Sequence, residues 1–164
     1  MSAKAEEPSY EVLKTLEEGV EIRKYGAQIR ASSQTGRENR SFGILAEYIF
    51  GRNDKNEQIG MTAPVITSGD KMSFVMPRRY SIKALPKPLN DQIKIHEVDE
   101  IEVAVLRFSG FTSPKTVDEK TGELIKILET NEIKIDGLPF LMRYNPPWTL
   151  PFLRRNEVAI KIEI

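Results

Sequence analysis

The chain has 164 residues, 40% of them apolar, and 24 basic residues balance 24 acidic ones. This length and apolar content suit one domain with a sizeable core, and the balanced charge provides no field that would draw the protein to nucleic acid or to an anionic membrane. The absence of cysteine excludes disulfides, thiolate metal sites and cysteine nucleophiles.

Residues 1–9 are small, polar and charged, which predicts a loose N-terminal tail. This segment has acids where a signal peptide needs an apolar run. No later stretch approaches the roughly 18 consecutive apolar residues of a membrane span. We therefore expect a cytoplasmic protein that does not enter a membrane.

The first part of the chain alternates between apolar and polar residues, with one interruption by a helical pattern. The alternation predicts strands over 10–16, 20–25, 28–35, 59–66 and 74–77. Between Arg37 and Phe50 the apolar residues recur at the spacing of one helix face, and Gly51 follows where a helix ends; these residues are Phe42, Leu45, Ala46, Ile49 and Phe50. The pattern predicts one helix between the third and fourth strands.

The prolines of residues 77–90 exclude a regular helix and predict a connector. Beyond it, strands are predicted over 93–98, 101–108, 139–144 and 156–162. Ser113 and Pro114 open a helix whose apolar stripe runs to about residue 130. The order of strands and helix resembles that of the first half.

Both halves read as βαββ units, over about 10–77 and 93–164, within one domain of residues 10–164. Two such units can pair their strands into one curved antiparallel sheet with a helix on each half. The predicted fold class is α+β: two βαββ pseudo-repeats that form a distorted antiparallel β-barrel flanked by two helices.

The sequence contains no recognisable catalytic constellation. Its one histidine, His96, lies on the polar side of a predicted strand without a neighbouring partner, so we interpret it as solvated. The acidic residues gather at turns and helix starts, and no phosphate loop or metal-ligand spacing occurs. The chain is more typical of a binding protein than of an enzyme.

A proline-rich loop near the C-terminus is the clearest candidate for a binding site. It contains Trp148, Leu150 and Phe152, followed by Arg154 and Arg155. An apolar surface with a basic edge suits a flat, hydrophobic molecule that has carboxylates. The alternative, that the loop only covers one end of the core, stays open at this point.

Several motifs in order resemble the SOUL haem-binding protein family. They are Val20-Glu-Ile-Arg-Lys-Tyr-Gly26, Ile59-Gly-Met-Thr-Ala-Pro-Val65, Phe74-Val-Met-Pro77, Tyr144-Asn-Pro-Pro147 and Leu153-Arg-Arg-Asn-Glu-Val158. The resemblance implies the distorted barrel of two βαββ repeats. It also implies a hydrophobic cleft for haem or another tetrapyrrole, formed by the first helix and the loop before the last strand.

Carried onto this sequence, the resemblance places the ring against Phe42, Leu45, Ile49, Trp148, Leu150 and Phe152, with Arg154, Arg155 and Lys24 near the carboxylates. Some animal members of the family have a histidine, proposed as the iron ligand, where this chain has Lys24. A protonated amine does not ligate haem iron, so that ligand is excluded, and the metal ligand stays unknown, with methionine, tyrosine or His96 as alternatives.

The expected function is non-enzymatic binding of haem or a porphyrin in a shallow hydrophobic cleft, for buffering or carriage. Two alternatives remain: a small-molecule sensor or effector-binding module, and an enzyme acting on a hydrophobic substrate. The expected partner is a tetrapyrrole or another hydrophobic small molecule, without nucleic acid or membrane. The sequence does not indicate an oligomeric state.

Overall fold

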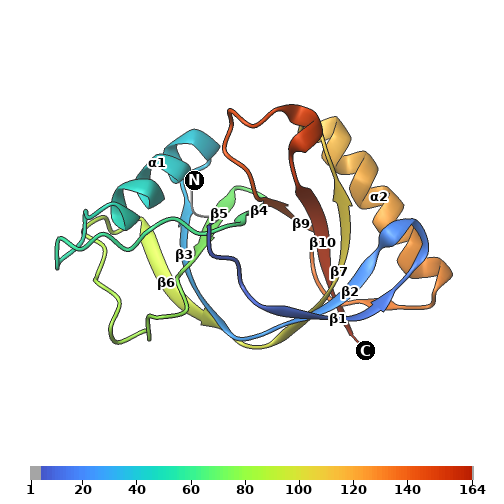
Figure 1. Ribbon diagram of the computed structural model, residues 1–164, viewed down its shortest axis with the longest axis horizontal. Helices are drawn as coiled ribbons and strands as arrows, with labels where there is room; N and C mark the ends of the chain where they lie inside the picture. The colour runs from blue at the N-terminus through green and yellow to red at the C-terminus, as the bar shows by residue number, and fades with distance from the viewer. Residues whose placement is uncertain (1–4, 164) are drawn as a thin grey trace. The chain divides into compact units, whose positions relative to one another are not determined.

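The computed structural model describes residues 5–163 (Figure 1). In chain order its elements are β1 (Tyr10–Thr15), the 3-10 turn η1 (Glu17–Gly19), β2 (Glu21–Tyr25), β3 (Gln28–Gln34), α1 (Glu38–Ile49), β4 (Val65–Ser68), β5 (Lys71–Val75), β6 (Ile93–Val98), β7 (Ile101–Phe108), α2 (Pro114–Thr130), β8 (Lys134–Ile135), β9 (Phe140–Arg143), the 3-10 turn η2 (Pro151–Leu153) and β10 (Asn156–Glu163). The α+β class, with two helices and antiparallel strands, is confirmed.

The chain forms two compact units. The first unit contains residues 27–99 together with 5–8, and the second contains residues 9–26 and 100–163. The β1–β2 hairpin therefore belongs to the second unit, because β2 pairs with β7. In chain order, by contrast, the hairpin stands at the start of the first βαββ pattern.

In the first unit, β4, β5, β3 and β6 pair in that order, all antiparallel. Helix α1 packs its apolar stripe on β3 and β5, where Leu45 and Ile49 join Phe74 in the core. The helix ends where the sequence predicts, since Phe50 is its C-cap and Gly51 follows with a φ of 124°.

In the second unit the order is β1, β2, β7, β10 and β9, again antiparallel, and β8 pairs with the far end of β10. Helix α2 begins at Pro114, and the Ser113 side chain caps it by accepting a hydrogen bond from the Thr116 N–H at 3.3 Å. Leu124 and Leu128 anchor the helix in the core and are fully buried.

Alternation along the strands gives the second unit's sheet two different faces. Ile22, Leu106 and Val158 lie on the face covered by α2 and belong to its apolar core. Their neighbours Arg23 and Glu157 lie on the opposite face, because successive side chains in a strand alternate. Both faces of this sheet are buried at these positions, although one is apolar and the other charged.

Four details differ from the sequence-based expectation, the first being that the strand expected over 74–77 is β5, which runs from Lys71 to Val75. The strand expected from residue 59 starts only at Val65, because the N–H groups of Ile59 and Gly60 donate to the Ile49 carbonyl at the end of α1 instead of joining a ladder. The short strand β8 and the turn η2 were not predicted, since each is too short to show a period.

The expected N-terminal tail covers residues 1–9, of which 1–4 lie outside the described residues. From Glu6 onward the segment is not loose. The Glu6 carbonyl accepts a hydrogen bond from the Ala63 N–H at 2.9 Å, and its carboxylate accepts one from the Arg78 N–H at 2.8 Å. These two bonds attach the segment to the first unit.

Candidate functional site

The proline-rich loop between β9 and β10 carries half of the predicted ring-binding side chains, Trp148, Leu150 and Phe152. At its centre, in η2, the Leu153 N–H donates to the Leu150 carbonyl at 2.9 Å. The Gly110 N–H donates to the Pro151 carbonyl at 2.8 Å, which ties the loop to the end of β7. The loop therefore has a defined conformation although it lies outside the sheet ladder.

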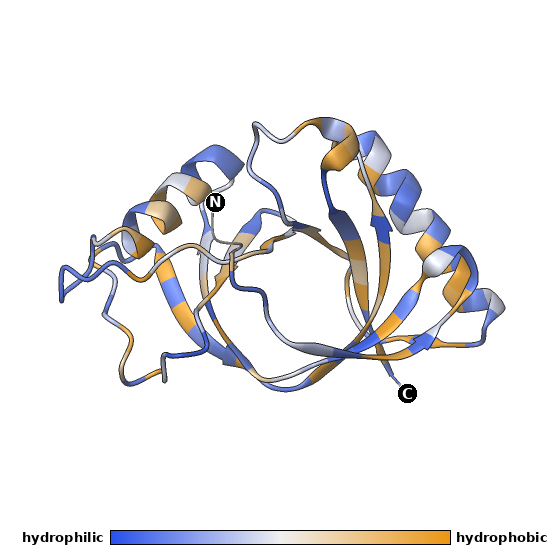
Figure 2. Cartoon of the chain, in the orientation of Figure 1, coloured by the Kyte–Doolittle hydropathy of each residue, from blue (hydrophilic) through white to orange (hydrophobic). Residues whose placement is uncertain are grey.

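The apolar side chains of this loop are exposed. Trp148 is 82% exposed and Phe152 is 72% exposed, and Leu150 and Leu153 are also accessible. Phe111, which follows Gly110 just after the end of β7, adds a fifth exposed side chain. In Figure 2 the helical turn before β10 contains orange, hydrophobic segments. We call these five residues the apolar loop surface. Grouped exposure of this kind marks a binding surface more often than a packing defect.

Arg154 forms hydrogen bonds with two backbone carbonyl groups of its own loop. Its Nε donates to the Thr149 carbonyl at 2.9 Å, and its Nη2 donates to the Pro147 carbonyl at 2.8 Å. The guanidinium carbon lies 5.4 Å from the centre of the Phe111 ring. The Nη1 group retains donor hydrogens that a carboxylate could accept. Arg154 can therefore support the loop and still provide a cation beside the apolar loop surface.

The other two predicted cations are engaged elsewhere in the second unit. The Lys24 ammonium on β2 lies 3.5 Å from a Glu100 carboxylate oxygen, and both side chains are exposed. Arg155 donates from Nε to Glu157 at 3.1 Å, and its guanidinium stacks 3.9 Å from the Tyr144 ring centre. Lys24 thus remains accessible to a ligand, whereas Arg155 is part of a buried ion-pair network.

The three predicted residues of α1 have different environments in the first unit. Leu45 and Ile49 are fully buried in its core and offer no surface to a ligand. Phe42 is 40% exposed, and its ring centre lies 5.5 Å from that of Phe74. Phe42 is therefore the accessible member of the three.

An open pocket of about 600 Å³ lies at the C-terminal end of α1 in the first unit. Its lining includes the exposed side chains of Phe50 and Leu89 together with the Glu47–Arg52 ion pair. This pocket is a second place where an apolar ligand could contact the molecule.

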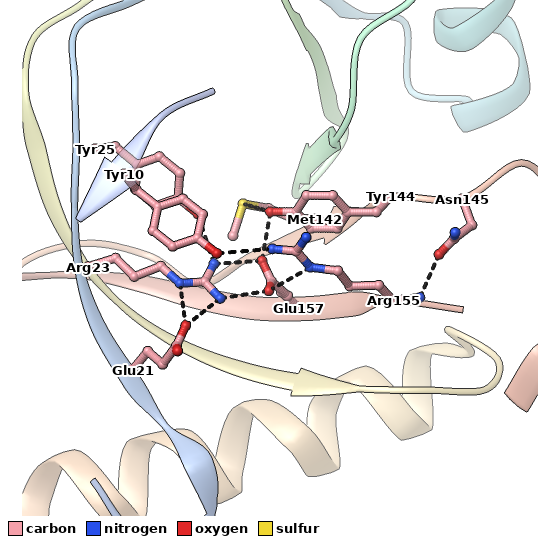
Figure 3. Close-up of polar contacts among 9 residues, drawn as sticks. All are labelled: Tyr10, Glu21, Arg23, Tyr25, Met142, Tyr144, Asn145, Arg155 and Glu157. Carbon is pink, nitrogen blue, oxygen red and sulfur yellow. Dashed lines mark hydrogen bonds and ion pairs between the residues drawn. The ribbon is translucent and has the colours of Figure 1, made fainter. Parts of the chain in front are cut away.

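A buried ion pair dominates the sheet face opposite α2 (Figure 3). Arg23 on β2 donates from its two Nη atoms to the two carboxylate oxygens of Glu157 on β10, each at 2.8 Å. Its Nε donates to Glu21 at 2.8 Å, and Nη1 also donates to the Tyr25 hydroxyl at 2.9 Å. Arg23 is 3% exposed and Glu157 is 0% exposed. Such a bidentate pair fixes both side chains.

Two further groups donate to the Glu157 carboxylate. The Tyr144 hydroxyl donates at 2.7 Å and Arg155 at 3.1 Å. Burial alone would raise the pKa of Glu157, but the hydrogen bonds and charge of Arg23, with those of Tyr144 and Arg155, lower it overall. Burial and the Glu157 charge raise the pKa of Tyr144. At neutral pH the carboxylate is therefore ionised and the Tyr144 hydroxyl is protonated.

Arg23, Tyr25, Tyr144 and Glu157 occur in the family motifs of the sequence, but the sequence reasoning did not predict that their side chains meet. The alternation around Glu157 shows which face of the strand is polar. It does not show that this face is covered. The spacing does indicate which side chains share a face. Glu157 and Arg155 lie two residues apart, as do Arg23 and Tyr25, so the members of each pair lie on one side of the strand.

His96 on β6 of the first unit is partly buried. Desolvation, with the charges of Lys71 and Arg30, lowers its pKa, so the imidazole is neutral at pH 7. Among residues 5–163 no group of three or more histidine and acidic side chains could hold a metal ion. No helix within that range is long and apolar enough to cross a membrane.

A family model described as SOUL heme-binding protein matches residues 5–161. Heme-binding protein 1 from Sus scrofa is 31% identical over 125 residues, which cover 70% of this chain and 65% of that protein. Heme-binding protein 2 from Homo sapiens is 31% identical over 129 residues, which cover 71% of this chain and 62% of that protein. The matched region thus spans just under two thirds of the length of these relatives.

Solved structures with the same fold have little sequence in common with this chain. The EcmrR C-terminal domain aligns with a TM-score of 0.61 at 11% identity, over 94% of this chain and 98% of that one. A hydrolase from Listeria innocua aligns with a TM-score of 0.59 at 10% identity, over 98% and 94%. At these identities the likeness concerns the fold alone.

Proposed function

Because this chain belongs to the SOUL heme-binding protein family, we propose that it binds haem or a related tetrapyrrole through the apolar loop surface. The observation that carries the proposal is the exposure of Trp148 and Phe152 on a loop that is held in place by backbone hydrogen bonds. Contact with a flat, apolar ring would remove these side chains from water, and each would contribute in proportion to the area it buries.

The side chains of the loop fit a porphyrin ring and its carboxylates. Aromatic faces stack on a planar ring, and the free Nη1 donors of Arg154 match a propionate carboxylate. Lys24, whose partner Glu100 is exposed, could provide a second cation. Leu45 and Ile49 are buried in the first unit, so Phe42 is the α1 residue that could take part.

The apolar part of the loop does not offer an iron ligand, and the hydroxyl of Tyr144, at the start of the loop, is bound to Glu157. Residues 146–153 are Pro-Pro-Trp-Thr-Leu-Pro-Phe-Leu, without histidine, methionine, tyrosine or cysteine. Capture at this surface would therefore depend on the ring and the carboxylates, not on the metal. We expect protoporphyrin IX without iron to bind about as tightly as hemin.

An exposed surface suits reversible binding better than permanent retention of a cofactor. We propose that the protein buffers or carries the tetrapyrrole in the cytoplasm without transforming it.

The test is a titration of the purified protein with hemin and with protoporphyrin IX, followed by the Soret absorbance. The matched variants are Leu150→Ala, in the apolar loop surface, and Leu138→Ala, an 80% exposed leucine just before β9. We expect Leu150→Ala and Trp148→Ala to lower the affinity for both ligands severalfold. We expect Leu138→Ala to leave both affinities unchanged. Equal affinity in all variants would exclude this surface.

Two variants of the first unit show whether its exposed aromatics take part. Phe42→Ala tests the accessible residue of α1, and Phe50→Ala tests the open pocket at the end of that helix. A loss in Phe50→Ala with no loss in Trp148→Ala would move the ring to that pocket and overturn the assignment to the loop.

A further inference from the structure

A smaller pocket lies in the second unit on the charged face of its sheet. Its volume is about 200 Å³, and its lining consists of Tyr10, Gly19, Glu21, Arg23, Val105, Arg107 and Arg155. The β1, β2 and β7 strands provide most of these residues, and Arg155 comes from the segment just before β10. The pocket is too small for a tetrapyrrole. Its lining is mostly charged and polar, whereas the apolar loop surface is hydrophobic.

Positive charge predominates around this pocket. Three guanidinium groups line it, whereas Glu21 is the single carboxylate of the lining and Glu157 is buried beside Arg23 and Arg155. The five charged groups leave one positive charge uncompensated. A small anion bound in the pocket would neutralise this charge.

The three arginines differ in how far their donors are used. All donor groups of Arg23 are committed, to Glu21, Tyr25 and Glu157. Arg155 is bound to Glu157 and stacked on a tyrosine ring. Both guanidiniums are thus fixed in position and contribute charge to the pocket wall.

Arg107 is the exception. It lies opposite Glu157 in the pairing of β7 with β10, and opposite residues in a pair share one face of the sheet. Glu157 is nevertheless occupied by other donors, and the side chain of Arg107 forms no hydrogen bond or ion pair with any residue in the described part of the chain. Its side chain is exposed, so its five N–H donors face the pocket mouth and solvent.

Tyr10 adds a neutral donor to the same pocket. Its hydroxyl oxygen accepts a hydrogen bond from Arg155 Nη2 at 3.4 Å, and its ring lies 4.2 Å from the Arg23 guanidinium carbon. The hydroxyl hydrogen remains available to donate.

We propose that this pocket binds a small oxyanion, a phosphate or carboxylate group, with Arg107 as the main donor. The fork of the Arg107 guanidinium would hold two oxygens, and the Tyr10 hydroxyl a third. Arg23 and Arg155, which Glu157 keeps in place, attract the anion without moving. A ligand of this size is a free ion or the charged end of a larger metabolite.

The test is a titration of the ¹⁵N-labelled protein with inorganic phosphate and, separately, with malonate, at constant ionic strength maintained with sodium chloride. The amide signals of Gly19 and Val105 in the lining report binding. We expect saturable shifts with at least one of the two anions, and the tighter one identifies phosphate or carboxylate as the preferred group.

Three variants make the test specific. Arg107→Gln should weaken binding about tenfold, the usual scale for one charge-assisted interaction. Arg40→Gln, a change of another exposed arginine without a partner among the described residues, should have no effect. Glu21→Gln removes the negative charge of the lining yet keeps an acceptor for Arg23, and should tighten binding.

Two results would overturn the proposal. One is the absence of saturable shifts for both anions, and the other is equal binding by the Arg107→Gln and Arg40→Gln variants. Neither result would bear on the tetrapyrrole proposal, because that proposal concerns different residues and is measured by the Soret band.

Discussion

The two carboxylate oxygens of Glu157 each accept a hydrogen bond from a different Nη atom of Arg23, although 134 positions separate the two residues in the chain. Both side chains are almost completely removed from solvent. Their pairing joins β2 to β10 across the intervening strand β7, on the face of the sheet opposite α2.

Loss of the Glu157 charge should destabilise the protein strongly. Glu157→Gln removes the fully buried carboxylate and leaves the Arg23 guanidinium with only the partly exposed Glu21 as a counter-charge, so we expect the free energy of unfolding to fall by about 3–5 kcal/mol. Urea denaturation measures this change. As a control, Glu163→Gln in the exposed Lys134–Glu163 pair should cost at most about 1 kcal/mol. Similar losses in both variants would contradict the central role of the buried pair.

Acid should destabilise the protein through the same carboxylate. The pKa of Glu157 is lowered in the folded state, so its contribution is fully present above the unfolded value of 4.5 and is lost as the pH falls through the lower folded value. Urea midpoints measured between pH 7 and pH 2 should therefore decline below about 4.5. The decline should be shallower in Glu157→Gln, and parallel curves for the two proteins would refute this source of acid sensitivity.

Substitutions at two residues of α1 should destabilise the protein to different extents. Leu45→Ala creates a cavity in the core of the first unit and should cost about 2–5 kcal/mol. Phe42→Ala removes a half-exposed ring and its edge contact with Phe74, and should cost only about 1 kcal/mol. Thermal unfolding separates the two. If Phe42→Ala were the more damaging change, the assignment of Phe42 to the surface would be wrong.

Arg154 should determine how well the loop is ordered. Arg154→Gln cannot bridge the carbonyls of Thr149 and Pro147 in the same way, so the loop should open more often. Hydrogen exchange at the Gly110 amide, which donates to Pro151, measures this opening. We expect faster exchange there in Arg154→Gln and unchanged exchange in Arg40→Gln. Unchanged exchange in both would show that the backbone bonds alone hold the loop.

The helices and most strands were predictable from the sequence because the residue patterns that indicate them are local. The apolar spacing from Phe42 to Ile49 and the Ser113–Pro114 start identify α1 and α2 without any knowledge of the fold. Strand pairing is not local: alternation in β2 does not reveal that its neighbour is β7 rather than β3. The division into units could not be predicted for that reason.

The environment of each candidate residue was harder to foresee than its element. A helical stripe predicts that Leu45 and Phe42 lie on one side of a helix, yet one is in the core and the other at the surface. Likewise, Arg154 and Arg155 look equivalent in the sequence, although Arg154 bonds to loop carbonyls and Arg155 to a buried carboxylate. Such differences depend on distant parts of the chain, on which local patterns carry no information.

The path of the chain also has a consequence for biosynthesis. The β1–β2 hairpin is translated about 75 residues ahead of β7, the strand with which it pairs, and at roughly 5–20 residues per second this interval lasts several seconds. Until then the hairpin has an unpaired edge, and Arg23 has Glu21 but not Glu157 as a counter-charge, because Glu157 is made later still. Residues 27–99, by contrast, leave the ribosome as one uninterrupted segment and can fold first.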